Sequence, residues 1–181
     1  MAVMNLRFRP LRRTDFGMLA QWLAAPHVQA WWREPSTLEA VAANYGPSVD
    51  GADPTEHFVI ESDGVAIGLI QRCRLGDAPE YLQAMQPAGA AADAATLDYL
   101  IGDPDRIGQG LGPALIADFA RLTWRRYPDA PAIVIAVQQD NRRSWRALEK
   151  AGFERVWSGV VESGDPSDEG PSYVYVLHRP A

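Results

Sequence analysis

Residues 106–112 read Arg-Ile-Gly-Gln-Gly-Leu-Gly, and this stretch decides the fold. It follows a strand-like segment, Thr96–Ile101, and opens Leu111–Trp124, where Leu111, Leu115, Phe119 and Leu122 recur at helical spacing. Glycines let the backbone approach a ligand closely, and free amides at a helix N-terminus suit phosphate oxygens. The stretch therefore predicts a phosphate-binding loop or, alternatively, a helix start made flexible by glycine.

Two familiar phosphate loops do not fit this stretch. A Walker loop needs Gly-Lys-Ser or Gly-Lys-Thr, and residues 106–112 contain no lysine. A Rossmann fingerprint that began at Gly110 would need a third small residue where Leu115 stands. A phosphate loop here must therefore belong to another class.

A second stretch, residues 141–153, reads NRRSWRALEKAGF and lies beyond one expected strand, Ala132–Val137. It predicts a helix over Asn141–Lys150, and Gly152 is the residue type that usually follows a helix. A well-formed amphipathic helix explains Gly152, but it does not explain why this helix follows a glycine loop at this spacing.

The paired stretches resemble the hallmark motifs of the GNAT acetyltransferases, a Gly-x-Gly pyrophosphate loop and an Asn-led helix that ends in Gly-Phe. The resemblance implies acetyl-CoA as co-substrate, no metal, and one mixed α/β domain over residues 1–181. It also implies a mostly antiparallel sheet, splayed between two parallel strands that hold the pantetheine arm, with helices on both faces. The residues that it implies for acetyl-CoA binding are Tyr99, Leu100, Ile101, Ile107, Gly108, Gln109, Gly110, Leu111, Gly112, Asn141 and Ser144.

The match extends over nearly the whole chain to one GNAT branch, the aminoglycoside 6′-N-acetyltransferases. Residues 27–32 resemble that branch's His-x-x-x-Trp-Trp segment, and Glu169-Gly170-Pro171 resembles its late acidic-Gly-Pro turn. The resemblance implies acetylation of the 6′-amine of an aminoglycoside, which confers resistance to that antibiotic. Five residues are the expected acceptor contacts: Trp32, Tyr45, Asp77, Asp98 and Glu169.

Asp98 is the predicted catalytic base. A primary ammonium cannot attack a thioester, so a carboxylate or imidazole near the amine must take one proton. Asp98 resembles the branch's active-site Asp, and strand alternation would place it on one face with Thr96 and Leu100. A bulged strand near Tyr99–Ile101 is expected to supply an amide to the oxyanion. The alternative role for Asp98 is a salt bridge or a turn cap.

Four residues depart from the family pattern. Leu148 stands where the superfamily often has a Tyr that acts as acid for the departing thiolate, and Leu cannot donate a proton. Ala136 and Val137 stand where the branch often has Asp-Pro, and Ile107 where the superfamily has Arg or Gln. These departures leave two alternatives open: a hydroxamate-siderophore precursor acyltransferase and a non-catalytic acyl-CoA sensor. The former branch favours His where Asp98 stands, which argues against it.

Composition restricts the partners. The 181 residues carry a net charge of −6, which argues against nucleic acid and favours a small polycationic amine. Only Asp77, Glu80 and Asp93 add carboxylates within the irregular stretch 76–94. The longest apolar runs are too short to span a bilayer, and the N-terminal residues lack the apolar core of a signal peptide. Cys73 is the only cysteine, so no intrachain disulfide can form. We therefore expect a cytoplasmic monomer or homodimer.

The remaining elements follow from periodicity and turn signals. Thr14 is expected to cap a helix with an apolar face, and Ser36 to Glu39 form a capping-box pattern before a helix through Tyr45. Asp63-Gly64 predicts a hairpin turn. The expected strands are Leu6–Arg9, Phe58–Glu61, Val65–Ile70, Thr96–Ile101, Ala132–Val137, Phe153–Val161 and Tyr173–His178, and 76–94 and 162–172 are expected loops.

Overall fold

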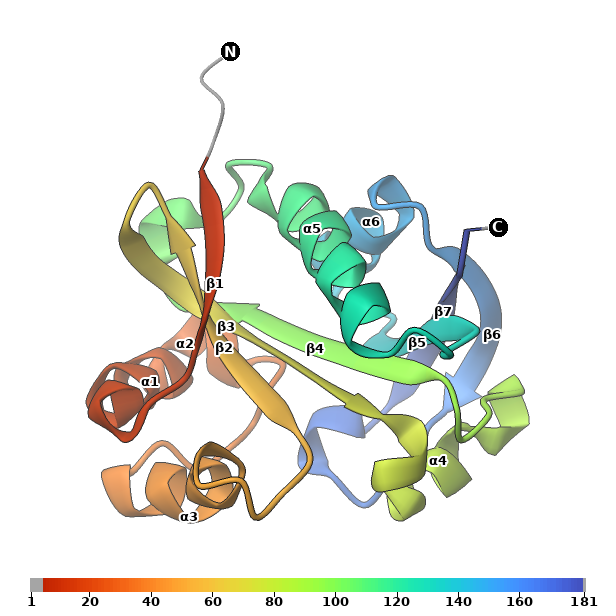
Figure 1. Ribbon diagram of the computed structural model, residues 1–181, viewed down its shortest axis with the longest axis horizontal. Coiled ribbons are helices and arrows are strands. Elements are labelled where there is room, and N and C mark those ends of the chain that lie inside the picture. Colours follow the sequence, from red (N-terminus) through yellow and green to blue (C-terminus); the bar gives the residue numbers. More distant parts are fainter. Residues whose placement is uncertain (1–4, 181) are drawn as a thin grey trace. The chain divides into compact units, whose positions relative to one another are not determined.

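The computed structural model describes residues 5–180 and contains mixed helices and strands (Figure 1). The helices are α1 (Phe16–Ala24), α2 (Pro26–Gln29), α3 (Leu38–Val49), α4 (Pro79–Met85), α5 (Leu111–Arg126) and α6 (Arg142–Lys150). The strands are β1 (Leu6–Pro10), β2 (Glu56–Ser62), β3 (Val65–Arg74), β4 (Ala95–Ile101), β5 (Ala132–Gln138), β6 (Glu154–Val160) and β7 (Pro171–His178). Contacts divide the chain into two units, and β3 and β4 contribute residues to both.

Unit 1 contains the described residues of Met1–Gln71 together with Asp98–Gln109. Its strands follow the hydrogen-bonded order β1-β2-β3-β4, and β1 pairs with β2 in antiparallel register. The predicted hairpin is confirmed, because Asp63 and Gly64 join β2 to β3 with φ angles of 51° and 81°. Two positive φ angles match the twist of a tight antiparallel turn.

The core of unit 1 includes one face of α1. The predicted apolar positions Phe16, Leu19, Trp22 and Leu23 are all buried there. The predicted cap is wrong, because Thr14 lies inside a short 3-10 turn that precedes α1. The Asp15 carboxylate fixes this turn. It accepts a hydrogen bond from the Arg12 amide and two from the Arg9 guanidinium.

The N-terminus of α3 also differs from the capping box expected for Ser36 to Glu39. Thr37, one residue later than Ser36, is the N-cap, and its hydroxyl accepts the amide of Ala40 at 3.2 Å. The expected apolar residue Leu38 is the first residue of α3 and is 60% exposed, whereas Val41 and Tyr45 are buried as predicted.

Unit 2 contains Arg72–Leu97 and the described residues of Gly110–Ala181. Its strand order is β3-β4-β5-β7-β6; β4 and β5 pair in parallel, with Ala95 opposite Ile133. Strand β7 is antiparallel to both β5 and β6. A parallel pair needs a crossover, and α5 supplies it. The mostly antiparallel sheet with one parallel pair is thus confirmed, while a splay further along β4 and β5 stays a prediction.

Two expectations in unit 2 need correction. Leu122, expected on the inward face of α5, is half-buried. Ile116, Ala120 and Thr123 fill that face beside the correctly predicted Leu115 and Phe119.

Residues 76–94, expected to be an irregular loop, contain α4, which starts at Pro79 and buries Met85. Proline is favoured in the first helical turn, but a two-turn helix offers too little periodicity to recognise.

His57 on β2 gives unit 1 a pH-dependent stability. Its Nδ1 lies 2.9 Å from the Ser48 hydroxyl, its ring packs edge-on against Tyr45, and burial lowers the pKa of His57 from 6.5 to about 4. The unfolded chain binds this proton more readily than the folded one between those two values. We therefore expect His57 to lower the free energy of unfolding by about 2 kcal/mol from pH 7 to pH 5.

Denaturant titrations at both pH values, for the wild type and His57→Gln, measure this contribution. The variant has no imidazole to protonate, so its loss of stability on acidification should be smaller by about 2 kcal/mol. Equal losses in the two proteins would show that the imidazole does not titrate in this window.

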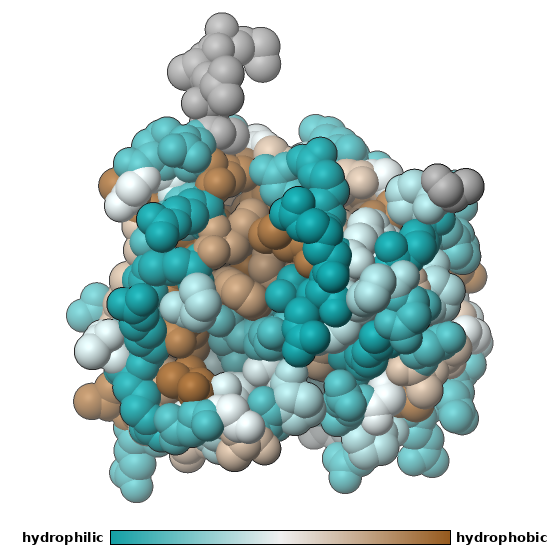
Figure 2. Space-filling view, in the orientation of Figure 1, coloured by the Kyte–Doolittle hydropathy of each residue, from teal (hydrophilic) through white to brown (hydrophobic). Residues whose placement is uncertain are grey.

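The surface view shows hydrophilic residues over much of the visible face, with smaller hydrophobic areas between them (Figure 2). No helix within residues 5–180 is long and apolar enough to cross a membrane.

Candidate active site

The glycine loop begins after a short capped turn. Asp103 accepts the amide of Asp105 at 3.0 Å, which starts the 3-10 turn Pro104–Arg106. Gly108 and Gly110 then adopt φ angles of 80° and 75°. This left-handed conformation strains most L-residues, so both positions favour glycine. An added Cβ at either position would meet no atom within 4 Å, so the backbone there is openly accessible.

The first turn of α5 presents uncapped amides. Gly110 is its N-cap and has no side chain to accept a bond from the helix. Pro113 lacks an N–H, which leaves the amides of Leu111 and Gly112 at the positive end of a helix of 16 residues. Accessible glycine backbone followed by uncapped amides fits the oxygens of a pyrophosphate.

Gly112 also sets the packing of α5 on α6. A Cβ built on Gly112 would lie 3.0 Å from the Ala147 Cβ, so two small residues allow the helices to approach (Figure 1). The expected Asn-led helix is present, and Asn141 caps it: its Oδ1 accepts the amide of Ser144 at 3.3 Å. Gly152, at φ 94°, ends the helix as predicted, with the Phe153 amide bonded to the Leu148 carbonyl.

Asp98 lies on β4 with its side chain exposed, and its Oδ1 accepts the amide of Tyr99 at 2.9 Å. Leu97 and Leu100 are both buried, so burial along β4 does not alternate strictly around Asp98. A shared face for Asp98 and Leu100, and a bulge near Tyr99–Ile101, stay predictions.

The His-x-x-x-Trp-Trp segment contacts the C-terminal end of β4. The Trp32 indole donates to the Tyr99 carbonyl at 3.3 Å, and the His27 Nε2 lies 2.9 Å from the Ile101 carbonyl. Side chains thus satisfy two carbonyl groups of the strand end. The sequence resemblance identified this segment, but it did not indicate that role.

The two predicted aromatic walls lie in the core of unit 1. Trp32 is 8% exposed and Tyr45 is 3% exposed. The Tyr45 hydroxyl donates to the Glu34 carboxylate at 2.8 Å, which fixes a half-buried acidic group that sequence reasoning missed. Contact of Trp32 or Tyr45 with an acceptor stays a prediction.

The predicted acceptor carboxylates of unit 2 are solvent-exposed. Asp77 ends a short 3-10 turn before α4, and Glu169 follows another after β6. The loop that carries Glu169 has an internal bond of 2.5 Å from the Ser163 hydroxyl to Asp168, and burial raises the pKa of the Asp168 carboxyl above its usual value. Glu169 therefore extends from a segment with ordered turns.

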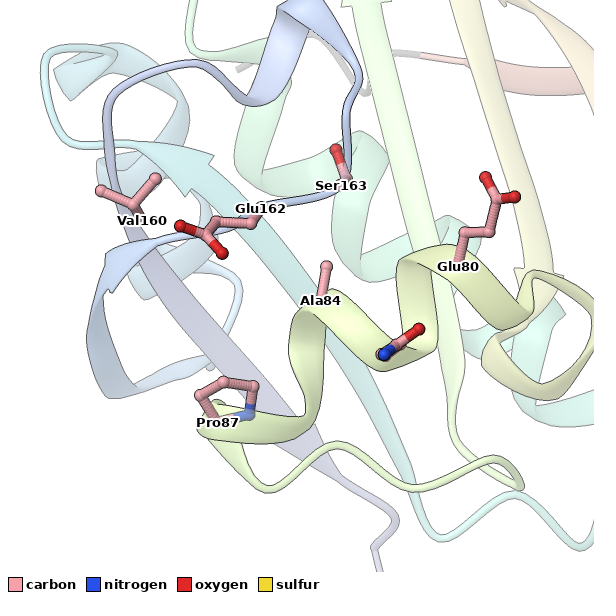
Figure 3. A pocket seen from close by; sticks show the side chains of 7 residues that line it. Glu80, Ala84, Pro87, Val160, Glu162 and Ser163 are labelled. Atoms are coloured by element: carbon pink, nitrogen blue, oxygen red, sulfur yellow. The ribbon is translucent and has the colours of Figure 1, made fainter.

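A pocket of about 440 Å³ lies between α4 and the end of β6 (Figure 3). Glu80 and Gln83 line it from α4, and Val160, Glu162 and Ser163 line it from the other side. Two carboxylates in a mixed polar and apolar pocket suit a cationic group. Glu80 was a predicted candidate, whereas Glu162 has no sequence motif that would have identified it.

The sequence matches a model described as an acetyltransferase (GNAT) domain over residues 12–159. The chain belongs to the GNAT acetyltransferase family. Within residues 5–180, no group of three His, Cys, Asp or Glu side chains is arranged to hold a metal ion.

Named relatives of this GNAT chain include two enzymes called aminoglycoside N(6′)-acetyltransferase type 1, from Klebsiella pneumoniae and Serratia marcescens. Each is 28% identical over 98% of this chain and 85% of its own length. The fold is similar to that of the crystal structure of aminoglycoside acetyltransferase AAC(6′)-Ib in complex with coenzyme A and kanamycin. That match has a TM-score of 0.79 and 25% identity, and it covers 97% of this chain and 95% of the other.

One departure from the GNAT pattern is also clear in the structure. Leu148 is fully buried, and its carbonyl accepts the amides of Ala151 and Phe153 at the end of α6. The superfamily often has a tyrosine at this position as the proton donor to the thiolate, and the leucine side chain has no proton to donate.

Proposed function

We propose that this GNAT chain transfers an acetyl group from acetyl-CoA to the 6′-amine of an aminoglycoside and so confers resistance. The observation that carries the proposal is the near full-length match to relatives named for that activity. The open glycine loop before α5 supports acetyl-CoA as co-substrate. The whole chain is proposed to act as one domain in the cytoplasm, as a monomer or homodimer.

The residues proposed to hold acetyl-CoA act mainly through backbone groups. The amides of Gly108 to Gly112 are proposed to bind the pyrophosphate, since accessible N–H groups at a helix start suit its oxygens. Ile107 and Gln109 lie within that loop, and Gln109 donates its side-chain amide to the Asp105 carbonyl at 2.8 Å. The backbone of Tyr99, Leu100 and Ile101 is proposed to line the acyl end, and Asn141 and Ser144 to fix the start of α6.

Asp98 is proposed to take the proton that the acceptor amine must lose. Its carboxylate is exposed, and the bond from the Tyr99 amide fixes one oxygen. A carboxylate held by its own strand can accept a proton without a change in backbone conformation. The nitrogen lone pair then attacks the thioester carbon, and a backbone amide of the Tyr99–Ile101 segment donates to the developing oxyanion.

The departing sulfur does not require an acid from α6. Leu148 cannot donate, but an alkyl thiol has a pKa of about 8.5, so its thiolate leaves tolerably well near neutral pH. Tyr99 or water is proposed to return the proton. The buried Leu148 is therefore compatible with turnover.

Several carboxylates are proposed to recognise the acceptor. Asp98 and Glu169 lie in segments that resemble the aminoglycoside branch, and Asp77 is an exposed third candidate. A polycationic amine is attracted to separated carboxylates on a chain whose net charge is −6. Because exposed charges are screened by salt, the encounter should weaken as ionic strength rises.

Acceptor selectivity is the direct test. We expect the thioester of acetyl-CoA to be cleaved in the presence of kanamycin or tobramycin, which carry a 6′-amine. We expect no cleavage with a related aminoglycoside that has a 6′-hydroxyl instead. The expected kcat/KM falls by about tenfold between 50 and 500 mM NaCl, because the attraction is screened. Release of coenzyme A, followed with a thiol reagent, measures both effects.

A matched amine with a single positive charge separates salt effects on the polycationic acceptor from those on acetyl-CoA. Turnover on a peptide or hydroxylamine acceptor but on no aminoglycoside would reduce the assignment to a GNAT of other specificity. Binding of acetyl-CoA without turnover on any amine would instead support an acyl-CoA sensor.

A further inference from the structure

Two side chains from a distant part of the chain hold the backbone at the C-terminal end of β4. The Nε2 of His27, in α2, lies 2.9 Å from the Ile101 carbonyl oxygen, and the Trp32 indole donates to the Tyr99 carbonyl at 3.3 Å. A carbonyl oxygen can only accept, so the His27 Nε2 carries the proton of its bond. All four residues belong to unit 1, and the two bonds fix carbonyl groups on either side of one residue.

The peptide between these two anchored groups is directed by strand β3. Gly68 of β3 allows the Leu100 carbonyl to approach closely, since a Cβ added at Gly68 would lie 2.1 Å from that oxygen. In a planar trans peptide the N–H points opposite to the C=O. The Ile101 amide, which shares its peptide with the Leu100 carbonyl, therefore points away from Gly68.

The peptides on both sides of this amide are held. The following peptide is bonded at each end, because His27 contacts the Ile101 carbonyl and the Gly102 amide donates to the Ile67 carbonyl at 2.8 Å. The preceding peptide is held through its carbonyl by the indole. With its neighbours held in this way, the backbone around the Ile101 amide has little freedom to shift.

We propose that His27 and Trp32 are positioning residues for acetyl transfer, which hold the Ile101 amide where it donates to the oxyanion. This inference rests on the proposed function, in which an amide of the Tyr99–Ile101 segment has that role. A donor stabilises the oxyanion best when it is fixed before charge develops on the oxygen, so its support affects the rate more than the binding. Each of the two side chains acts through the backbone that it bonds.

The test removes one donor at a time. His27→Leu replaces the imidazole with an apolar side chain, and Trp32→Phe keeps a buried ring without the indole N–H. Each variant should lower kcat for acetyl-CoA and kanamycin by about tenfold or more, because a small displacement of a catalytic group has a large effect on the rate. The Kd for acetyl-CoA should stay close to the wild-type value, since the amides proposed to hold the pyrophosphate remain. His27→Gln, whose side-chain amide can still donate, should restore most of the lost kcat.

His178→Leu and Trp124→Phe are the matched controls. His178 is exposed at the end of β7, and Trp124 is half-buried in α5, with the Arg179 guanidinium over its ring. Both variants should keep the wild-type kcat. Calorimetric titration with acetyl-CoA gives the Kd and the concentration of protein that is competent to bind. Each kcat is divided by that concentration, so partial unfolding of a variant does not count as a loss of rate.

The outcomes separate this inference from the function on which it rests. Trp32→Phe retains most of the packing and carries the test if His27→Leu does not fold. A wild-type kcat in the folded variants, or a loss confined to the Kd for acetyl-CoA, would overturn this inference alone. A wild type that acetylates no amine would overturn the proposed function and this inference with it.

Discussion

Asp98→Asn is expected to lower kcat by about 10²-fold or more, while the Kd for acetyl-CoA stays unchanged. Asn has nearly the same shape, and its oxygen can still accept the Tyr99 amide that now bonds Asp98 Oδ1 at 2.9 Å. The strand should therefore keep its conformation and lose only a group that takes a proton. Steady-state kinetics at saturating aminoglycoside, with calorimetry for acetyl-CoA, measure the two effects separately.

Asp118→Asn provides the control for Asp98→Asn. It removes the carboxylate of an aspartate on the surface of α5, where Asp118 pairs with Arg121. This variant should retain wild-type kcat, since surface ion pairs contribute little. An unchanged kcat for Asp98→Asn at saturating amine would make Asp98 a structural residue that caps its own strand.

Gly110→Asp is expected to weaken acetyl-CoA binding by about 10²-fold or more. The new carboxylate would stand beside the uncapped amides of the first turn of α5 and repel the pyrophosphate from them. Aspartate tolerates a left-handed backbone better than most residues, so we expect only a modest loss of stability. Calorimetric titration of acetyl-CoA gives the loss in affinity, and a thermal melt verifies the fold.

Gly110→Asn separates charge from conformation. Asn and Asp tolerate the left-handed backbone at φ 75° to a similar degree, so the strain is matched between the variants. Asn lacks the negative charge and should weaken binding by about tenfold or less. If Gly110→Asp bound acetyl-CoA as tightly as the wild type, the pyrophosphate would have to lie elsewhere.

Local sequence signals determined most elements of the fold. The hairpin turn at Asp63 and Gly64 and the Gly152 end of α6 depend on a few neighbouring residues, and both were predictable. The same applies to the glycine loop, since only glycine readily adopts the conformations of Gly108 and Gly110. Helix starts were less certain: the α3 cap shifted to Thr37 because Ser, Thr and Asp are near-equivalent caps.

Contacts between distant residues decided the rest. No local pattern shows that His27 and Trp32 bond the carbonyls of Ile101 and Tyr99, or that Glu80 and Glu162 line one pocket. The sequence by itself indicated the family, and it predicted the phosphate loop and the candidate base, because these depend on residue type at short spacing. The tertiary structure alone decided which indole contacts the end of β4 and which helix faces meet at Gly112 and Ala147. Such pairings arise from packing between segments far apart in the chain, where side-chain volume and hydrogen-bond satisfaction select partners that periodicity does not encode.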